Sequence, residues 1–459
     1  MRWRIIAAME SRKMQSFVRE PARDVPVAYE CDVCVIGGSC TGVFAAVRAA
    51  RLGASVAIVE HNTIFGGMAA AALVNEWHCT NDVSGQKRII GGLTQEMLAR
   101  LRQRDALIEY GPTDRIQYRF NSAEMVIELD SLVREHGIRG FLAARCVAAS
   151  GGDGRLDAAI IEDKSGRRAI RAKVFIDASG DGDLVRRAGF AMHRPAVLQP
   201  TSYCGFYAGF RALPGVWKRV RHLSEQFGYP LDTATPWIHD WPGTSEVSNV
   251  YGPRMNGVDG ADADALTEAY MRARRYHRIL ADMIVAETGI RVTPIAWAHA
   301  MGVRESWHTR CLHQLTGAEL LNGVRFPDAI ANGIYPVDIH HPDGTLLRYL
   351  DGREEVIGKS DAHRWSRWRD ESHPVPPCYH VPYRCLVPVG SQNVLVAGRC
   401  LDADRDGFAG VRVMVNMNQT GEAAGVAAWL AIHSGHCVAE IDPAGLRGEL
   451  ARGGSIVLE

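Results

Sequence analysis

The chain has 459 residues, with 52 basic and 52 acidic side chains, 47% hydrophobic residues and 23% charged residues. This length predicts more than one domain, and the composition is that of an ordinary soluble globular protein. The zero net charge gives no bulk field for nucleic acid or a membrane surface, and no run reaches the roughly 20 apolar residues of a membrane span, so neither partner is expected.

Residues 1–28 are predicted to be a lead-in segment, because they carry a short apolar patch followed by charge and lack the pattern of a signal peptide. The 11 cysteines are odd in number and have no framework spacing. This usage favours reduced thiols and a cytoplasmic setting. Cys31 and Cys34 lie three apart on a predicted strand, where they face opposite ways, so we interpret both as core residues rather than a redox pair.

A nucleotide-binding unit is predicted next. Residues 31–37 form a buried strand, residues 41–52 a helix with one apolar face, and residues 55–60 a second buried strand that ends in Glu60. Gly37 makes the tight turn after the first strand, and the acid follows at the spacing of a dinucleotide-binding fingerprint. The helix N-terminus would face a pyrophosphate and the acid a ribose hydroxyl. The fingerprint alone does not decide between NAD and FAD.

Ser39 departs from the fingerprint, which has glycine at that position. Serine is small and its hydroxyl can donate to a phosphate, so we expect the turn to keep its function. Gly38 keeps the turn flexible, and Gly42 lets the helix pack closely.

Four further segments are expected to complete the unit. Gly66-Gly67 would let the backbone pass close to an extended ligand, and residues 121–136 read as an amphipathic helix with a capping box from Asn121 and Glu124. Strands near 139–149, 155–163 and 168–176 read as an antiparallel meander that ends in the acidic turn "DASGDGD". Downstream, "VLVAGR" is a buried strand, followed by a helix from about residue 417. Its small residues are Gly421, Ala424, Gly425 and Ala428, and its start would face the pyrimidine end of a flavin.

These pieces resemble the FAD-dependent oxidoreductase family often labelled "FAD-oxidored", a branch of the glutathione-reductase-like flavoproteins. The matching segments include "VIGGSCTGVFAAVRAARLGASVAIVE", "FGGMAAAALV", "MGVRESWHTRCLHQLTGAELLNG", "FPDAIANGIYPVDIHHPDG" and "NVLVAGRCLDADRDGFAGVRVMVNMNQTGEAAGVAA". No second glycine fingerprint appears, so a built-in NAD(P)H domain is not expected. The loop "CLDADRDGFAGVRV" departs from the usual small, hydroxyl-rich version of its motif.

The resemblance implies an α/β fold, with a Rossmann-like FAD-binding domain of the glutathione-reductase type and an inserted α+β substrate domain. The expected division is 29–195 and 381–435 for FAD, 196–380 for substrate, and 436–459 as a C-terminal tail. FAD contacts carry over to Gly37, Gly42, Glu60, Gly67, Asp181 and Gly398, with Gly421 near the flavin ring. We extend this cofactor-binding set to neighbouring residues: Gly38, Ser39, Thr41, His61, Gly66, Met68, Asp177, Gly180, Arg399, Gln419 and Thr420.

The chemistry needs a base with an orienting group, because flavin takes a hydride while a proton leaves the substrate. In "IYPVDIHHPDG", alternation on a strand over 335–340 puts Asp338 and His340 on one face and Tyr335 on the other. A structural polar pair is the alternative. His78 is the second candidate base, and Arg304 would bind an anionic substrate group unless it forms an ion pair. A metal site from Asp338, His340, His341 and Asp343 is a weaker alternative because adjacent strand residues diverge, and no metal is expected.

The function expected from these patterns is an FAD-dependent dehydrogenase or oxidase acting on a small polar molecule, with oxygen or another carrier as the external electron acceptor. A flavin monooxygenase or halogenase is the first alternative, although no Trp-x-Trp-x-Ile-Pro segment is present. A non-catalytic flavin-binding protein is the second. A homo-oligomer is compatible with the sequence, which does not identify the substrate.

Overall fold

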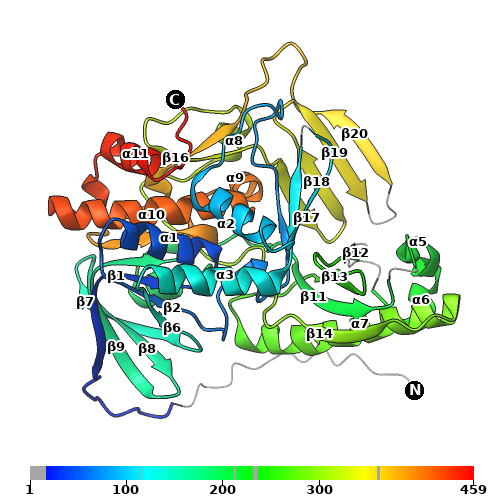
Figure 1. The fold of residues 1–459 in the computed structure, drawn as a ribbon, viewed down its shortest axis with the longest axis horizontal. Helices are drawn as coiled ribbons and strands as arrows, with labels where there is room; N and C mark the ends of the chain where they lie inside the picture. The colour runs from blue at the N-terminus through cyan, green and yellow to red at the C-terminus, as the bar shows by residue number, and fades with distance from the viewer. Residues whose placement is uncertain (1–16, 114, 211–212, 231–235, 359–361) are drawn as a thin grey trace.

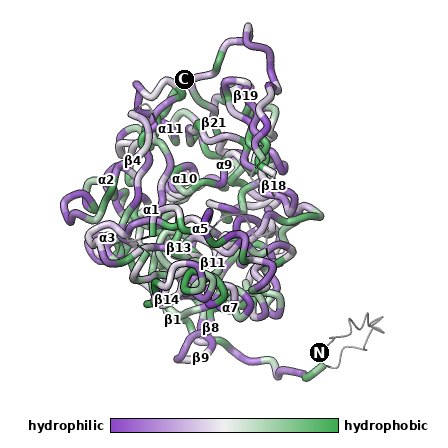
Figure 2. The backbone as a smooth tube through the Cα atoms, turned by 90° about the vertical axis from the view of Figure 1, so that its right-hand side faces the viewer, coloured by the Kyte–Doolittle hydropathy of each residue, from purple (hydrophilic) through white to green (hydrophobic). Residues whose placement is uncertain are grey.

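The computed structural model describes residues 17–113, 115–210, 213–230, 236–358 and 362–459 (Figure 1). The first 16 residues of the predicted lead-in lie outside these ranges. Residues 17–26 run away from the body as an exposed, mostly hydrophilic segment (Figure 2). The first strand begins at Val27, so the ordered fold starts two residues inside the segment predicted as a lead-in.

A mixed seven-stranded sheet forms the centre of the fold. Its parallel part has the order β6-β2-β1-β9, and β22 pairs in parallel with the end of β9. The first half of β9 pairs instead with β8, which pairs with β7, and both pairings are antiparallel. The strands are β1 (Val27–Ile36), β2 (Val56–Val59), β6 (Arg139–Phe141), β7 (Arg145–Gly152), β8 (Arg155–Asp163), β9 (Gly166–Asp177) and β22 (Val394–Val396).

This topology corrects one prediction. Residues 139–149 are not a single strand of the meander, because Ala143 has a positive φ of 52° and separates two strands. β6 turns to pair with β2, and only β7 joins the antiparallel part. Because β22 pairs with β9, a segment more than 200 residues downstream completes the parallel sheet. The predicted division into domains stays a prediction.

Helices α1, α2, α3 and α10 cover one face of the parallel strands (Figure 1). They span α1 (Cys40–Arg51), α2 (Gly92–Arg102), α3 (Ser122–Glu135) and α10 (Met414–Ser434). α3 buries Met125, Leu129, Leu132 and Val133, as predicted. Asn121 accepts from two backbone N–H groups, but the reciprocal Glu124 bond of a capping box is not formed.

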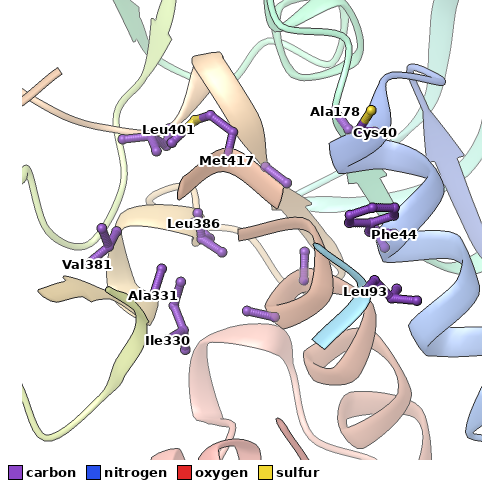
Figure 3. Close-up of a cluster of buried hydrophobic side chains, with 14 of the residues drawn as sticks. Cys40, Phe44, Leu93, Ala178, Ile330, Ala331, Val381, Leu386, Leu401 and Met417 are labelled. Atoms are coloured by element: carbon purple, nitrogen blue, oxygen red, sulfur yellow. The ribbon is translucent and has the colours of Figure 1, made fainter. Parts of the chain in front are cut away.

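α1 is buried all round over Cys40–Ala49, which the prediction of a single apolar face missed. The main reason is α10, which lies beside α1 on the same face of the sheet and packs closely against it. An added Cβ at Gly421 would lie 2.1 Å from the carbonyl oxygen of Thr41, and one at Gly425 would lie 2.1 Å from that of Ala45. The predicted small-residue face of α10 therefore lets two helix backbones approach closely. Figure 3 shows this core, with Cys40 and Phe44 on α1 and Met417 on α10.

The middle of the chain adds two further sheets and a long helix. The sheet β12-β13-β11-β14 packs on α7, and the sheet β17-β18-β19-β20 is a meander near the start of α10 (Figure 1). Their elements are β11 (Thr201–Ala208), β12 (Trp237–Asp240), β13 (Val247–Met255), α7 (Ala263–Thr288), β14 (Thr293–Trp297), β17 (Val337–His341), β18 (Gly344–Arg348), β19 (Arg353–Gly358) and β20 (His363–Arg367).

Short elements complete the framework. One small sheet has the order β3 (Glu76–Trp77), β5 (Gln117–Phe120), β4 (Leu107–Tyr110). A second pairs β16 (Ala329–Gly333) with β21 (Tyr379–Pro382), and a third pairs β10 (Met192–His193) with β15 (His308–Thr309). The shorter helices are α4 (Asp183–Arg187), α5 (Val216–Val220), α6 (Ser224–Phe227), α8 (Gly317–Leu321), α9 (Arg405–Val411) and α11 (Pro443–Arg452).

The last residues are anchored to α1 and α10. The Arg48 guanidinium of α1 donates to the backbone carbonyls of Glu449, Leu450 and Gly453. The buried Glu422 carboxylate of α10 accepts from the backbone N–H of Leu93, and burial raises its pKa to about 7. The predicted tail is thus part of the packed structure.

Among the described residues, no helix is both long enough and apolar enough to cross a membrane. All 11 cysteines are free thiols. Cys34 is a core residue as predicted, but Cys31 is only half-buried.

The contact between α1 and α10 predicts a steric effect on stability. Gly425→Ala would place a methyl group against the Ala45 carbonyl, and we expect it to lower the free energy of unfolding by roughly 1–3 kcal/mol. The control is Gly448→Ala in α11, where the nearest heavy atom lies 3.7 Å from the added Cβ and alanine favours the helix. Thermal unfolding followed by circular dichroism compares them. Equal midpoints in wild type and Gly425→Ala would show that the two helices do not pack this closely.

Candidate functional site

The turn between β1 and α1 excludes side chains. Gly37 has a φ of +105°, and an added Cβ would lie 2.3 Å from the Ala178 carbonyl oxygen. At Gly42 the added Cβ would lie 1.8 Å from the Gly37 carbonyl oxygen. The helix therefore begins directly above the strand ends, and Ser39 gives no side-chain cap to its first N–H groups. These groups and the positive end of the helix dipole suit a phosphate.

Ser39 also explains the paired glycines further along. It forms an isolated parallel bridge with Gly66, and the N–H of Gly66 donates to the Gly38 carbonyl at 2.8 Å. An added Cβ at Gly67 would lie 2.7 Å from the Cβ of Ser39. The serine therefore fills the space that Gly67 leaves, and the two positions are sterically coupled.

Glu60 is buried at the end of β2 and is held in place by backbone. Its Oε2 accepts from the N–H of Gly38, and its Oε1 accepts from the N–H of Asn62, both at 2.7 Å. His61 lies beside it, with Nδ1 at 3.1 Å from Oε1. Carboxylate oxygens accept more than one hydrogen bond, so a ribose hydroxyl has an acceptor there.

A cavity of about 780 Å³ opens from this turn into the middle of the molecule. Twelve of the predicted cofactor-binding residues line it: Gly37, Ser39, Thr41, Glu60, His61, Gly66, Gly67, Met68, Gly180, Asp181, Gly398 and Arg399. The glycine turn, the uncapped helix start and the buried acid all border one space. The residues present therefore fit an FAD molecule extended along this wall.

Six predicted cofactor-binding residues lie behind the cavity wall: Gly38, Gly42, Asp177, Gln419, Thr420 and Gly421. Asp177 accepts from the N–H groups of Leu184 and Val185, so it caps α4. Gln419 exchanges hydrogen bonds with the Asn332 backbone, and the Thr420 hydroxyl accepts from the Gly398 N–H. Their contacts support the wall, and Gly42 and Gly421 allow close packing.

The start of α10 takes the place that the sequence assigned to Gln419–Gly421. α10 begins at Met414 rather than near 417, and Val413–Asn418 line the cavity. Val413 is the N-cap and gives no side-chain hydrogen bond. A second helix N-terminus thus points into the same cavity as that of α1. The prediction placed the start late because no capping residue marks it.

The acidic loop before α10 has structural partners. Asp402 bonds His193 at 2.8 Å, Asp404 caps α9, and Arg405 bonds His341 at 2.9 Å. None of the residues 402–406 lines the cavity. The contact of His341 with Arg405 also separates it from Asp338 and His340. No group of three or more His, Cys, Asp or Glu side chains in the described ranges could hold a metal ion.

Asp338 and His340 share one face of β17, as predicted, and both line the cavity. Nε2 of His340 lies 3.2 Å from Oδ2 of Asp338. The sequence pattern predicted Tyr335 on the opposite face, but Tyr335 precedes β17, which begins only at Val337. The Tyr335 hydroxyl donates to the same Oδ2 at 2.7 Å. Arg412 donates to Oδ2 as well, at 2.8 Å. Burial acts to raise the pKa of Asp338, but His340 and Arg412 hold it well below 3.8.

Both ring nitrogens of His340 have partners. Nδ1 lies 3.0 Å from the Thr345 hydroxyl, while Nε2 faces Asp338. Burial lowers the pKa of His340 to about 3, so the ring is neutral at pH 7. A neutral ring with Nε2–H toward the carboxylate leaves Nδ1 to accept from Thr345. No ring nitrogen is then left to take a substrate proton.

His78 is different. It follows β3, lines the cavity and meets Tyr335 edge-on at 4.5 Å between ring centroids. Its buried Nδ1 atom has no hydrogen-bond partner in the described part of the chain. Burial lowers the pKa of His78 below 6.5. A neutral imidazole with an unused nitrogen therefore borders the cavity next to the Asp338 cluster.

Arg304 lines the same region. Its Nη1 donates to the Pro200 carbonyl and the Ser202 hydroxyl, and the ion pair considered as its alternative role is not formed with any described carboxylate. Arg254 and Arg412 stand near it, and sequence reasoning missed both. Arg254 lies on β13 in a segment without any motif, so no local signal identified it.

The solved structures that resemble the chain are distant in sequence. A geranylgeranyl bacteriochlorophyll reductase-like protein from Thermoplasma acidophilum has 12% identity and a TM-score of 0.44, over 92% of this chain and 83% of its own. The flavin-dependent brominase Bmp2 has 11% identity and a TM-score of 0.43, over 92% of this chain and 83% of its own. OxyS anhydrotetracycline hydroxylase from Streptomyces rimosus has 11% identity and a TM-score of 0.44, over 92% of this chain and 66% of its own. No curated protein matches the chain.

The family of the chain is shown by a comparison with family models rather than by these solved structures. The family described as FAD dependent oxidoreductase matches residues 32–450, which include the glycine turn, Glu60, β17 and the start of α10. FAD is accordingly the cofactor of this chain, and the residues of the cavity wall fit it. The chain therefore belongs to the FAD dependent oxidoreductase family.

Proposed function

We propose that the protein removes a hydride and a proton from a small polar substrate, as an FAD-dependent dehydrogenase or oxidase. The observation that carries this proposal is His78, which lines the cavity and whose buried Nδ1 has no hydrogen-bond partner among the described residues. Buried polar atoms normally have a hydrogen-bond partner, so this atom is suited to a polar group of a ligand. The antiparallel β7–β8 insertion between β6 and β9 supports the glutathione-reductase type of FAD fold within this proposal.

The bound isoalloxazine ring of FAD supplies a two-electron acceptor at this site. His78, kept neutral by burial, accepts the proton that leaves a substrate hydroxyl or amine through its Nδ1. Tyr335 packs against the His78 ring and fixes its plane, and its hydroxyl is in turn held by Asp338. The substrate thus loses one C–H and one O–H or N–H bond and gains a double bond.

Asp338 and His340 act here as positioning residues. Three groups converge on Oδ2 of Asp338, while its buried Oδ1 has no partner among the described residues. That oxygen can accept a hydrogen bond from the substrate. His340, fixed by Thr345, completes the cluster and keeps the carboxylate in one orientation.

Two other functions remain as alternatives, a flavin monooxygenase and a non-catalytic flavin-binding protein. A monooxygenase would consume NAD(P)H together with oxygen, and a binding protein would show no turnover. A hydride-removing enzyme needs only an external acceptor, oxygen or another carrier. Anaerobic bleaching of the FAD absorbance by substrates, compared with NAD(P)H consumption, separates the three. NAD(P)H-dependent hydroxylation of a substrate would overturn the proposal.

The Ser39 contact generates a prediction about cofactor retention. Ser39→Gly keeps the turn open and should retain FAD, whereas Ser39→Val should lose it, because the branched side chain collides with Gly67 and narrows the cavity. FAD content of the purified proteins is measured from the absorbance of cofactor released by denaturation. Ser150→Val, on the antiparallel strand β7, is the control and should retain FAD. Full FAD occupancy in Ser39→Val would mean that this turn does not border the cofactor.

His78→Ala should bind FAD normally but reduce it about 10²–10⁴-fold more slowly with substrate under anaerobic conditions. His222→Ala, at an exposed position, is the matched control and should keep the wild-type rate. His340→Ala should lie between the two, since it disturbs Asp338 without removing the proton acceptor. A wild-type rate in His78→Ala would contradict the assignment.

The pH dependence of flavin reduction follows from the lowered pKa of His78. The ring must be neutral to accept a proton, so the rate should hold from pH 8 to 6.5 and fall at lower pH. Stopped-flow reduction across pH 4.5–8 measures the profile. The acidic limb should vanish in His78→Ala. A wild-type rate already halved above pH 6.5 would show that another group accepts the proton.

A further inference from the structure

Three arginines from separate segments line the cavity around Asp338. Arg254 comes from β13, Arg304 from the loop between β14 and β15, and Arg412 from the residue just after α9. They are close enough to influence one another. The positive charges of Arg254 and Arg412 both act on Arg304, and Asp338 acts on Arg254 and Arg304.

Only one of these charges is neutralised by a described side chain. Arg412 forms an ion pair with Asp338 at 2.8 Å. Within the described ranges, no carboxylate lies within 4.0 Å of the guanidinium of Arg254 or Arg304. Tyr335 keeps its proton because burial raises its pKa well above 10.0, and burial keeps His78 and His340 neutral. The cluster therefore holds about two positive charges in excess.

Most N–H donors of the Arg254 and Arg304 guanidinium groups have no acceptor among the described residues. Among the described residues, the guanidinium of Arg254 has only a long contact to the Thr345 hydroxyl, at 3.5 Å. Arg304 uses Nη1 alone, which leaves Nη2 and Nε without a partner in the part of the chain that the structure describes. Burial, together with the charge of Arg254, lowers the pKa of Arg304 to about 9, so the guanidinium is still protonated at pH 7.

An uncompensated buried cation is costly, and two adjacent ones are more so. The cost is removed when a ligand brings negative charge between them. Guanidinium groups recognise planar oxyanions through paired N–H···O bonds, and a carboxylate suits that fork.

We propose that the substrate is a small organic acid, whose carboxylate binds between Arg254 and Arg304. This assignment rests on the proposed oxidoreductase site, because it names the class of molecule oxidised beside His78. The ion pair of Arg412 with Asp338 holds the third arginine away from the carboxylate. The substrate carboxylate offsets one of the two excess positive charges, and neutral analogues lose this contribution.

Binding is tested on the FAD-loaded full-length protein with malonate, its neutral analogue malonamide, and inorganic phosphate as probes. The perturbation of the flavin absorbance and the shift of the thermal unfolding midpoint are both recorded. Malonate should give a saturable change and malonamide none at the same concentrations. Equal responses to malonate and malonamide, or no response to malonate, would overturn the proposal. Tighter binding of phosphate than of malonate would replace the carboxylate by a phosphate group and overturn it too.

Variants locate the site. Arg304→Gln and Arg254→Gln should each weaken malonate binding about 10-fold or more, since each loses a charged hydrogen bond. Arg304→Lys keeps the charge but not the fork, and should lie between Arg304→Gln and wild type. The control is Arg278→Gln on the exposed side of α7, which should bind malonate as wild type does. Unchanged binding in both glutamine variants overturns the assignment.

The readouts separate this proposal from the proposed function. Malonate binding needs no turnover, so it persists even if no acid ever bleaches the flavin, and then only the proposed reaction fails. Conversely, rapid bleaching of the flavin by a neutral alcohol, without any malonate binding, would support the proposed reaction and overturn the proposal of an organic-acid substrate.

Discussion

The close contact between α1 and α10 is the constraint on which the site depends. Each backbone approaches the other where a methyl group would already collide, at Gly421 and Gly425. Both helices begin at the wall of one cavity. Two positive helix ends thus converge on one space, and this arrangement suits the phosphates of FAD and the negative charge of a reduced flavin. The middle of the chain then needs only to close the cavity.

Much of the FAD side could be predicted because its signals are local. The turn at Gly37, the acid at Glu60 and the pair Gly66-Gly67 lie within 31 residues. The glycines leave space at the turn, and Glu60 is held beside it by backbone N–H groups. Where prediction was less accurate, a distant partner decided the outcome. The all-round burial of α1 is due to α10, and the start of α10 carries no capping residue.

The substrate side could be predicted only in part. The shared face of Asp338 and His340 follows from strand alternation, which is local. Tyr335 lies outside the strand and therefore escapes the alternation rule. Arg254 and Arg412 are 84 and 74 residues away from Asp338 in the sequence, so no local spacing could reveal them. The state of His340 was also hidden, because the bond from Thr345 belongs to the neighbouring strand β18.

Burial treats the charged groups of this cavity unequally. It keeps the histidines neutral, since their ordinary pKa lies near 6.5, while the arginines stay charged even after a large downward shift. The same desolvation thus provides a neutral proton acceptor and a fixed positive field side by side.

The pairing of distant segments also has a consequence for biosynthesis. α1 leaves the ribosome long before α10, and at about 5–20 residues per second the interval is roughly 20–70 s. During that time the apolar surface of α1 that α10 later covers is open to solvent, and the strand edge of β9 that receives β22 is unpaired. The first nucleotide-binding unit therefore stays incomplete until α10 and β22 have been made. Its vulnerable period is synthesis itself, when this apolar surface and this strand edge are exposed to aggregation.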